Sequence, residues 1–289
     1  MPVSLPAGKK GFFSFEGVEK LGDREFALFS SLIYEKVGIY LKPEKKELLN
    51  ARLSKRMRAL GVRNFKDYYE LVVADRSGSE LVLLIDAVST NFTSFFREKA
   101  HFDFLVEKVL PELSTRASEG VKLWSAACSS GEEPYTLAMV LEEYFRSRGS
   151  GSSGFNIQAT DISTKVLATA DKGVYPEERV RTVPPEMLKR YFQKGVGRSS
   201  GYVKVKDPLK QHVEFRRLNL MEDFPWKNGF EIIFCRNVMI YFDRDTQERL
   251  VKKFYDSLVP GGYLFIGHSE SISRLDHGFK QVAATAYRK

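Results

Sequence analysis

The sequence predicts an α/β protein: a small all-helical domain, then a Rossmann-like domain with a small inserted antiparallel β-subdomain. Three observations predict this fold. Apolar residues recur at helical spacing from Asp23 to Val88, whereas from Thr90 onward apolar strands alternate with helices. A stretch at about 190–217 breaks that alternation with short, polar-faced strands between glycine- or proline-containing turns, which is typical of an antiparallel meander.

Composition excludes several classes of protein. The chain has 289 residues and a hydrophobic fraction of 43%, and no apolar run approaches the roughly 20 residues of a membrane span. Its start lacks the apolar centre of a secretory signal. Two cysteines and four scattered histidines suggest neither a disulfide framework nor a metal site. We expect a cytoplasmic monomer without metal or membrane insertion.

The chain divides at the change of pattern. We expect a flexible tail over residues 1–20, a helical domain over 21–88 and the larger domain over 89–289. Four helices are predicted for the first domain, in DREFALFSSLIYEKVG, PEKKELLNARLSKRMRALG, NFKDYYELVVA and SELVLLIDAVS.

In the larger domain the predicted strands are VKLWSA, FNIQATD, FEIIFCRN and GGYLFIG. Helices are predicted in EPYTLAMVLEEYFRS, STKVLATADKG and RDTQERLVKKFYDSL. This alternation indicates a parallel sheet covered on both faces, and the final FKQVAATAYRK is expected to return as an antiparallel edge strand. SGSSG at 150–154 is expected to be a flexible loop.

The segment WSAACSSGEEPYTLAM at 124–139 is the most informative part of the chain. It predicts a buried strand, a turn of small residues and a helix opened by Pro134. The turn lacks the G-x-G-x-x-G of a dinucleotide site. Glu133, at a helix start, would repel phosphate and attract a cation. S-adenosylmethionine, with a sulfonium, an ammonium and no phosphate, fits such a site; the alternative is an ordinary tight turn.

Further polar residues follow the predicted strands, where ligands bind in doubly wound sheets. Asp161 could accept hydrogen bonds from both hydroxyls of a ribose, or it could cap the next helix, although Ser163 can do that instead. Asn219 and Asn237 could bind an adenine edge or the polar tail of the cofactor. Each asparagine could also be a loop residue that bonds its own backbone.

TNFTSFFRE at 90–98 precedes the first helix of the larger domain. Asn91, Thr93 and Arg97 are spaced so that they could converge on one point. The three phenylalanines of this segment are expected to pack inward: Phe92, Phe95 and Phe96. The alternative is a capped helix with an aromatic core face and a solvated Arg97.

The motifs resemble one protein family. TNFTSFFRE, LWSAACSSGEEPYTLAM, ATDIS, FRRLNL, FCRNVMIYF and LVPGGYLFIGHSES occur in the order found in CheR-type chemotaxis receptor methyltransferases, and the resemblance runs from about Asp23 to the C-terminus. It implies a class I S-adenosylmethionine-dependent methyltransferase domain. It also implies methylation of glutamate side chains on the cytoplasmic helices of chemoreceptors, with S-adenosylhomocysteine as the second product.

The resemblance also implies roles for individual residues. Arg97 and Tyr241 would be catalytic, with Tyr241 near the methyl group. The cofactor shell would consist of Asn91, Thr93, Arg97, Glu133, Asp161, Asn219, Leu220, Arg236 and Asn237. Cys128 departs from the Ala or Ser more often found in relatives, but it is a compact filler that should not disturb binding. The substrate glutamate needs no base, because its pKa of about 4.3 leaves it ionised.

The net charge of +8 favours an acidic partner. The second predicted helix carries a one-sided set of basic residues, Lys45, Arg52, Lys55, Arg56 and Arg58. This face would attract the acidic helical region of a chemoreceptor, which the small domain contacts in the family. A solvated face is the plain alternative. RNA ranks second, because no exposed aromatic residues are interleaved for base stacking.

The glycines in KGVGRSSG match a loop that tethers some family members to a receptor C-terminal peptide. Gly195, Gly197 and Gly201 are therefore candidate peptide contacts, through strand addition to an exposed edge. The alternative is a hairpin with glycine in its turns. Two rival functions stay open for the whole chain: a nucleic-acid methyltransferase, and a signalling adaptor that binds cofactor without turnover.

Overall fold

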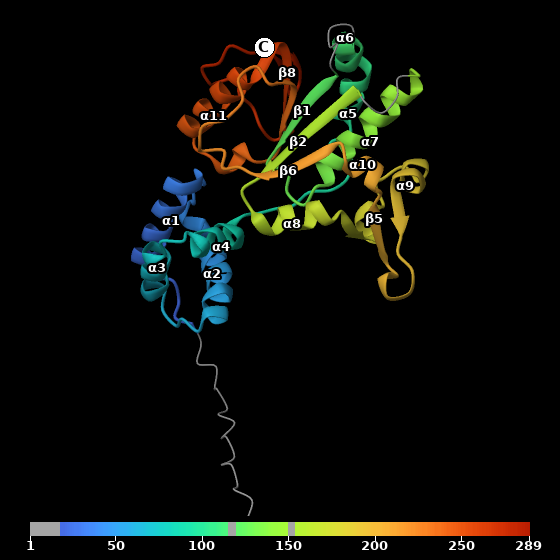
Figure 1. Ribbon diagram of the computed structural model, residues 1–289. Coiled ribbons are helices and arrows are strands. Elements are labelled where there is room, and N and C mark those ends of the chain that lie inside the picture. Colours follow the sequence, from blue (N-terminus) through green and yellow to red (C-terminus); the bar gives the residue numbers. More distant parts are fainter. Residues whose placement is uncertain (1–17, 115–119, 150–153) are drawn as a thin grey trace, which may run out of the picture.

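The computed structural model describes residues 18–114, 120–149 and 154–289. A helical domain lies beside a larger domain built on a twisted sheet, and helix α8 (Thr164–Lys172) contacts both the sheet and α4 of the helical domain (Figure 1). Most of the expected flexible tail and loop, residues 1–17 and 150–153, lies outside the described residues.

The four helices predicted for the first domain are confirmed. They are α1 (Asp23–Val37), α2 (Lys46–Leu60, after a 3-10 turn at Pro43–Lys45), α3 (Phe65–Ala74) and α4 (Ser79–Val88). Their apolar stripes meet in one core that includes Phe29, Leu53 and Tyr68, all buried. The helices start and stop where local chemistry directs: the Asn64 side chain caps α3, and Gly61 ends α2 in the left-handed conformation.

The main sheet is mostly parallel, as predicted. Its order is β6-β2-β1-β7-β8-β10-β9, and the first five strands are parallel to one another. Their bounds are β1 (Val121–Ala126), β2 (Phe155–Asp161), β6 (Val213–Arg217), β7 (Phe230–Cys235) and β8 (Leu258–Ile266). The expected C-terminal edge strand is instead an antiparallel hairpin of β9 (Lys280–Ala283) and β10 (Ala286–Arg288).

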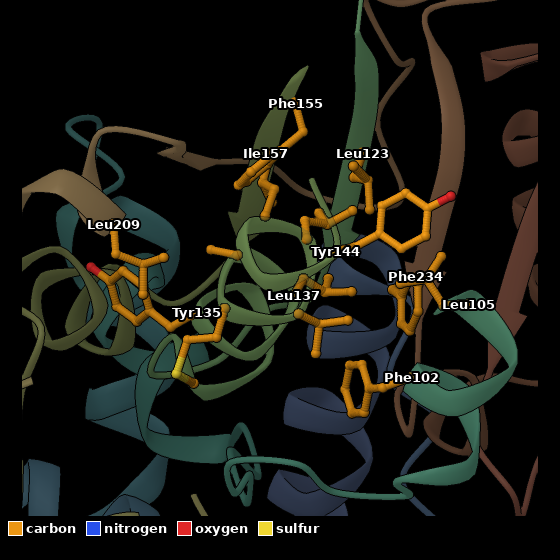
Figure 2. Packing of buried hydrophobic residues seen from close by; sticks show 14 of the residues in the cluster. Phe102, Leu105, Leu123, Tyr135, Leu137, Tyr144, Phe155, Ile157, Leu209 and Phe234 are labelled. Atoms are coloured by element: carbon orange, nitrogen blue, oxygen red, sulfur yellow. The ribbon is translucent and has the colours of Figure 1, made fainter. Parts of the chain in front are cut away.

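Both faces of the sheet are covered. Side chains alternate between the two faces along each strand, so each strand contributes to packing on both sides. On one face Leu123 of β1 and Phe234 of β7 pack against Leu137 and Phe102 (Figure 2). Leu137 belongs to α7 (Glu132–Ser147) and Phe102 to α5 (Ala100–Phe104). Helix α5 continues through a π-helical turn (Leu105–Val109) into α6 (Leu110–Ser114). On the other face, Trp124 packs against Phe254 of α11 (Arg244–Ser257).

The inserted subdomain exists, but its predicted position at 190–217 is wrong at both ends. Its antiparallel sheet has the order β3-β5-β4, with β3 (Val174–Pro176), β4 (Phe192–Lys194) and β5 (Tyr202–Val205). A 3-10 turn (Glu177–Val180) and α9 (Pro185–Tyr191) follow β3, another 3-10 turn (Gly197–Ser199) follows β4, and α10 (Asp207–Lys210) follows β5.

Residues 213–217 were expected to be the third meander strand, but they form β6 and pair in parallel with β2. The error has a physical cause. β6 pairs with β2 alone and lies at the edge of the sheet, so none of its side chains is fully buried. Its sequence therefore lacks the apolar run of a central strand and resembles a solvated hairpin strand.

Candidate functional site

The predicted catalytic and cofactor-binding residues gather around one cavity. The cavity lies where β1, β2 and β7 end, next to the point between β1 and β7 at which the strand order reverses. Ten predicted residues line it: Asn91, Thr93, Arg97, Glu133, Asp161, Asn219, Leu220, Arg236, Asn237 and Tyr241. The opposite wall comes from the helical domain, through residues that include Tyr40, Lys45 and Leu48. Lys45 and Arg52 of the predicted basic set lie in this wall, but sequence reasoning did not predict that the helical domain closes the cavity.

The turn from β1 to α7 forms the floor of the cavity. Its backbone is left-handed at Ala127 (φ 60°), Ser129 (φ 52°) and Gly131 (φ 95°). Gly131 is required sterically as well, since a Cβ there would lie 2.8 Å from the Tyr175 hydroxyl. Helix α7 begins at Glu132, two residues before the expected Pro134.

Asp161 is buried at the end of β2 and binds two backbone amides. Its carboxylate accepts hydrogen bonds from Ser129 N (2.8 Å) and Ser163 N (2.9 Å). Ser163 itself caps α8 by accepting from Val166 N, so the alternative role of Asp161 as the cap is wrong. Burial raises the pKa of Asp161, although the amide bonds oppose that shift. Each oxygen keeps a second lone pair, so the group can still accept two hydroxyl donors.

Arg236 is the central cation of the site. Its side chain is 2% exposed and lies 3.2 Å from Glu98 Oε2 and 3.3 Å from Glu133 Oε2. The Ser125 hydroxyl donates to Glu133 Oε1 (2.7 Å). Burial raises the pKa of Glu133. Burial would also raise the pKa of Glu98, but Arg236 and hydrogen bonds from Asn237 and His268 outweigh it and lower that pKa.

Glu270 organises the loop after β7, and sequence reasoning did not single it out. Its carboxylate accepts from four backbone amides: Gly267 (2.6 Å), Asn237 (2.9 Å), Val238 (2.9 Å) and Met239 (2.8 Å). These bonds hold Asn237, whose backbone is left-handed (φ 59°), and start the 3-10 turn Met239–Tyr241 that carries Tyr241. Glu270 stands within the quoted motif GHSES, but three of its four partners are about 30 residues away.

The helical domain is attached at Tyr241. Tyr40 N donates to the Tyr241 carbonyl (2.8 Å), and the Tyr34 hydroxyl donates to Asp243 Oδ2 (2.6 Å). Asn219 joins this interface, because its amide donates to the Lys36 carbonyl (2.7 Å) and its oxygen accepts from the nearby Met221 N (3.0 Å). Asn219 therefore hydrogen-bonds the backbone of its own loop, which was the alternative role predicted for it. It also hydrogen-bonds the helical domain, which was not predicted.

The segment 90–98 differs from its expected packing. Phe95 is buried, but Phe92, also expected to pack inward, is 74% exposed. Arg97 explains the difference: its guanidinium donates to the Phe92 carbonyl (3.0 Å) and lies 5.6 Å from the centre of the Phe92 ring. Ser129 Oγ donates to the Asn91 carbonyl (2.9 Å), which fixes this segment against the β1–α7 turn.

Spacing in the sequence did not indicate a cluster of Glu98, His101 and His268. The structure brings one ligand-type atom of each within 4.8 Å of the others. However, Glu98 is already paired with Arg236, and a divalent cation bound to the same carboxylate would face that guanidinium. His101 also contacts the Thr285 hydroxyl through Nε2. We assign the three residues to the polar network around Arg236.

We expect His101 to make stability depend on pH. Burial, followed by repulsion from Arg236, lowers its pKa to about 4. An unfolded chain takes up this proton near pH 6.5, so the free energy of unfolding should fall by up to about 3 kcal/mol as the pH drops from 6.5 towards 4. Urea titrations of wild type and His101→Gln at several pH values should differ in that window. Ring titration by NMR near pH 6.5 in the folded protein would contradict the prediction.

The basic arc predicted on α2 needs correction at two positions. Arg56 pairs with the buried Glu80 (2.6 Å), which also accepts from the Tyr68 hydroxyl (2.9 Å). Arg52 donates to Thr90 Oγ1 (3.0 Å) and to the carbonyls of Val88 and Ser89, at the junction between the domains. Both guanidinium groups therefore make contacts within the protein itself. Lys55 and Arg58 are exposed.

Local steric space or backbone conformation explains each of the three glycines in the 195–201 loop. A Cβ at Gly195 would lie 2.1 Å from the Ser199 carbonyl oxygen. Gly197 (φ 57°) and Gly201 (φ 85°) are left-handed. The hairpin alternative therefore explains the glycines without a ligand. Among the described residues β4 pairs with β5 alone, which leaves one edge of β4 without a strand partner.

Two family profiles match the chain: "CheR methyltransferase, all-alpha domain" over residues 24–89, and "CheR methyltransferase, SAM binding domain" over residues 91–288. No helix in the described part of the chain is long and apolar enough to cross a membrane.

Three curated relatives are named chemotaxis protein methyltransferases. The Klebsiella aerogenes protein is 40% identical over 92% of this chain and 90% of its own length. The Escherichia coli protein is 38% identical over 99% of this chain and 98% of its own length. The Borreliella burgdorferi protein is 40% identical over 92% of this chain and 94% of its own length.

Proposed function

Because the chain belongs to the CheR methyltransferase family, we propose that it methylates glutamate side chains on the cytoplasmic helices of chemoreceptors. Membership of this family makes the protein an S-adenosylmethionine-dependent methyltransferase of chemotaxis. The observation that supports glutamate as the substrate is a cavity lined by the buried Asp161 and the part-buried Glu133 together with Arg97 and Tyr241.

The donor chemistry of the cavity fits S-adenosylmethionine. Burial raises the pKa values of Glu133 and Asp161, and the positive charge and hydroxyl donors of a bound ligand would offset the cost of keeping these carboxylates ionised. Asp161 would accept the ribose hydroxyls, and Glu133 would attract the positive end of the ligand. The small residues of the β1–α7 turn would allow the ligand to lie against the backbone. When bound, S-adenosylmethionine supplies an electrophilic methyl group and leaves as S-adenosylhomocysteine.

The remaining task of the protein is to orient and desolvate the substrate. A glutamate carboxylate is ionised at neutral pH and has no proton to lose, so no general base is needed. Arg97 would steer the carboxylate. The hydrogen bond from Arg97 to the Phe92 carbonyl limits how tightly Arg97 can pair with the substrate carboxylate. The carboxylate therefore keeps its strength as a nucleophile. Tyr241, held through its backbone carbonyl by Tyr40, would fix the angle of approach.

We propose two contacts for the receptor. The exposed Lys55 and Arg58 of α2 would attract an acidic helical region, while Arg52 and Arg56 are already engaged within the protein. The unpaired edge of β4 and the adjoining 195–201 loop could take a receptor C-terminal peptide by strand addition.

The function is tested with labelled S-adenosylmethionine, purified protein and chemoreceptor-containing membranes. Label in receptor that is released as methanol by mild base is expected, because glutamate methyl esters are labile to base. Label in nucleic acid would favour the nucleic-acid methyltransferase. Cofactor binding without any transfer would favour the adaptor.

We expect Tyr241→Phe to lower kcat by about tenfold or more while cofactor affinity changes less than twofold, because an interaction made only in the transition state affects turnover alone. Single-turnover methylation and calorimetry measure the two quantities. The 3-10 turn should survive, since its anchoring bonds involve the backbone. Full single-turnover activity in Tyr241→Phe would make this tyrosine a packing residue.

A further inference from the structure

Three exposed apolar side chains surround the cavity. Phe92 is 74% exposed, Tyr40 54% and Leu48 43%, and all three line the cavity. They come from three separate segments: the start of the 90–98 segment, the link after α1, and α2. Single exposed apolar residues are ordinary, but a group at the opening of a site marks a contact surface.

The three residues are held firmly by their surroundings. Arg97 bonds the Phe92 carbonyl and lies against its ring. Tyr40 N donates to the Tyr241 carbonyl, and the adjacent Ile39 pairs with Phe242 as an isolated antiparallel bridge. Leu48 lies on α2 beside the fully buried Leu49. An ordered apolar surface loses little conformational entropy when a partner covers it.

Basic residues border this surface. Lys45, one turn before Leu48 on the same side of the cavity, is exposed and lines it, and Lys55 is exposed two turns beyond. A partner that suits both features must carry acidic residues and apolar residues on one face. An amphipathic helix with acidic residues along the edges of its apolar stripe has that pattern.

We propose that Tyr40, Leu48 and Phe92 form an apolar rim that packs against apolar residues on either side of the target glutamate in such a helix. The proposal rests on the proposed function and deepens it. When the helix docks, the rim covers the cavity mouth and excludes water from the glutamate carboxylate, while the basic border selects acidic sequence. Affinity for the protein substrate then depends on two separable terms, one apolar and one ionic.

The apolar and ionic contributions to receptor affinity can be distinguished by varying the salt concentration. Leu48→Ser is expected to raise the KM for receptor by about five- to tenfold, as truncation of an interface anchor does, and the increase should persist at high salt. Lys55→Ala should raise KM mainly at low salt. The matched control is Val73→Ser on α3, which removes an apolar side chain that is 58% exposed and does not line the cavity. Cofactor affinity, measured by calorimetry, should stay within about twofold in Leu48→Ser and Val73→Ser, since neither residue is assigned to cofactor binding.

Phe92 distinguishes packing from base stacking. Phe92→Leu keeps an apolar side chain and should retain the wild-type KM for receptor, whereas Phe92→Ser should raise it as Leu48→Ser does. A substrate whose bases stack on this ring would lose affinity equally in both variants.

The outcomes separate the rim from the proposed function. If wild type methylates receptor glutamates but Leu48→Ser and Phe92→Ser behave like Val73→Ser, the rim is refuted and the proposed function stands. If wild type methylates nucleic acid, or transfers no methyl group to receptor, both fail. A KM that is raised at both salt concentrations in Leu48→Ser and Phe92→Ser, but not in Val73→Ser, supports the rim.

Discussion

Replacing Glu270 by alanine is expected to lower the free energy of unfolding by roughly 4 kcal/mol or more, because four backbone N–H groups lose their acceptor and each unsatisfied buried donor costs about 1–3 kcal/mol. That is a large part of the 5–15 kcal/mol typical of a folded domain. The same bonds hold Asn237 and start the turn that carries Tyr241. Protein that still folds should therefore also lose cofactor affinity and turnover. Urea unfolding and calorimetry measure the two effects.

A graded series makes this prediction specific. Glu270→Gln keeps one acceptor oxygen but turns an amide NH₂ towards backbone donors, so its stability should fall between wild type and Glu270→Ala. Glu248→Ala removes a carboxylate from the surface of α11, where it pairs with Lys252, and should change stability far less than Glu270→Ala does. If Glu270→Ala were no less stable than Glu248→Ala, the carboxylate would not organise this loop.

Replacing Asp161 by asparagine is expected to weaken the binding of S-adenosylmethionine by at least about tenfold, because each hydrogen bond to a charged acceptor contributes about 1.5–3 kcal/mol and 1.4 kcal/mol is a factor of ten. The side chain also accepts from Ser129 N and Ser163 N, so the variant will lose some stability. Calorimetry at a temperature where both proteins are folded measures the affinity.

Ser163→Ala is the matched control. It removes the side chain that caps α8, two residues from Asp161, but keeps the backbone N–H that Ser163 donates to Asp161, and Ser163 itself does not line the cavity. A capping loss of about 1 kcal/mol should appear in its stability and leave cofactor affinity unchanged. Equal loss of affinity in both variants would mean that Asp161 acts only by supporting the local backbone.

The ion-pair network of the site could not be predicted from the sequence, although its members were quoted in motifs. Arg236 and Glu98 are 138 residues apart, and Glu98 has a left-handed backbone (φ 57°) that no local pattern indicates. Glu132 is a comparable case. It is fully buried and pairs with Arg179 of the inserted subdomain, 47 residues away. Such partners are chosen by how the chain folds back on itself.

The basic helix illustrates the same limit. Its sequence correctly predicts a helix with an apolar stripe, but Arg52 and Arg56 look no different from Lys55 and Arg58 in a count of 100° per residue. Only the packing of α4 and of the 88–90 junction against α2 engages the first two. Phe92 was wrongly predicted to be buried, because an aromatic residue usually packs inward. In the structure its ring lies beside Arg97 at the surface.

By itself the sequence determined the two-domain α/β architecture, the four helices of the first domain and the central strands of the main sheet; through the family resemblance it also indicated ten of the residues that line the cavity. It could do so because hydrophobic periodicity, capping residues and glycine turns act over a few neighbouring residues, and the ends of parallel strands converge in any doubly wound sheet. The tertiary structure alone decided that β6 joins the main sheet, that the helical domain closes the cavity, and which charges are paired. Those features depend on contacts between distant segments, where burial makes an unpaired charge costly and so selects partners that no local spacing reveals.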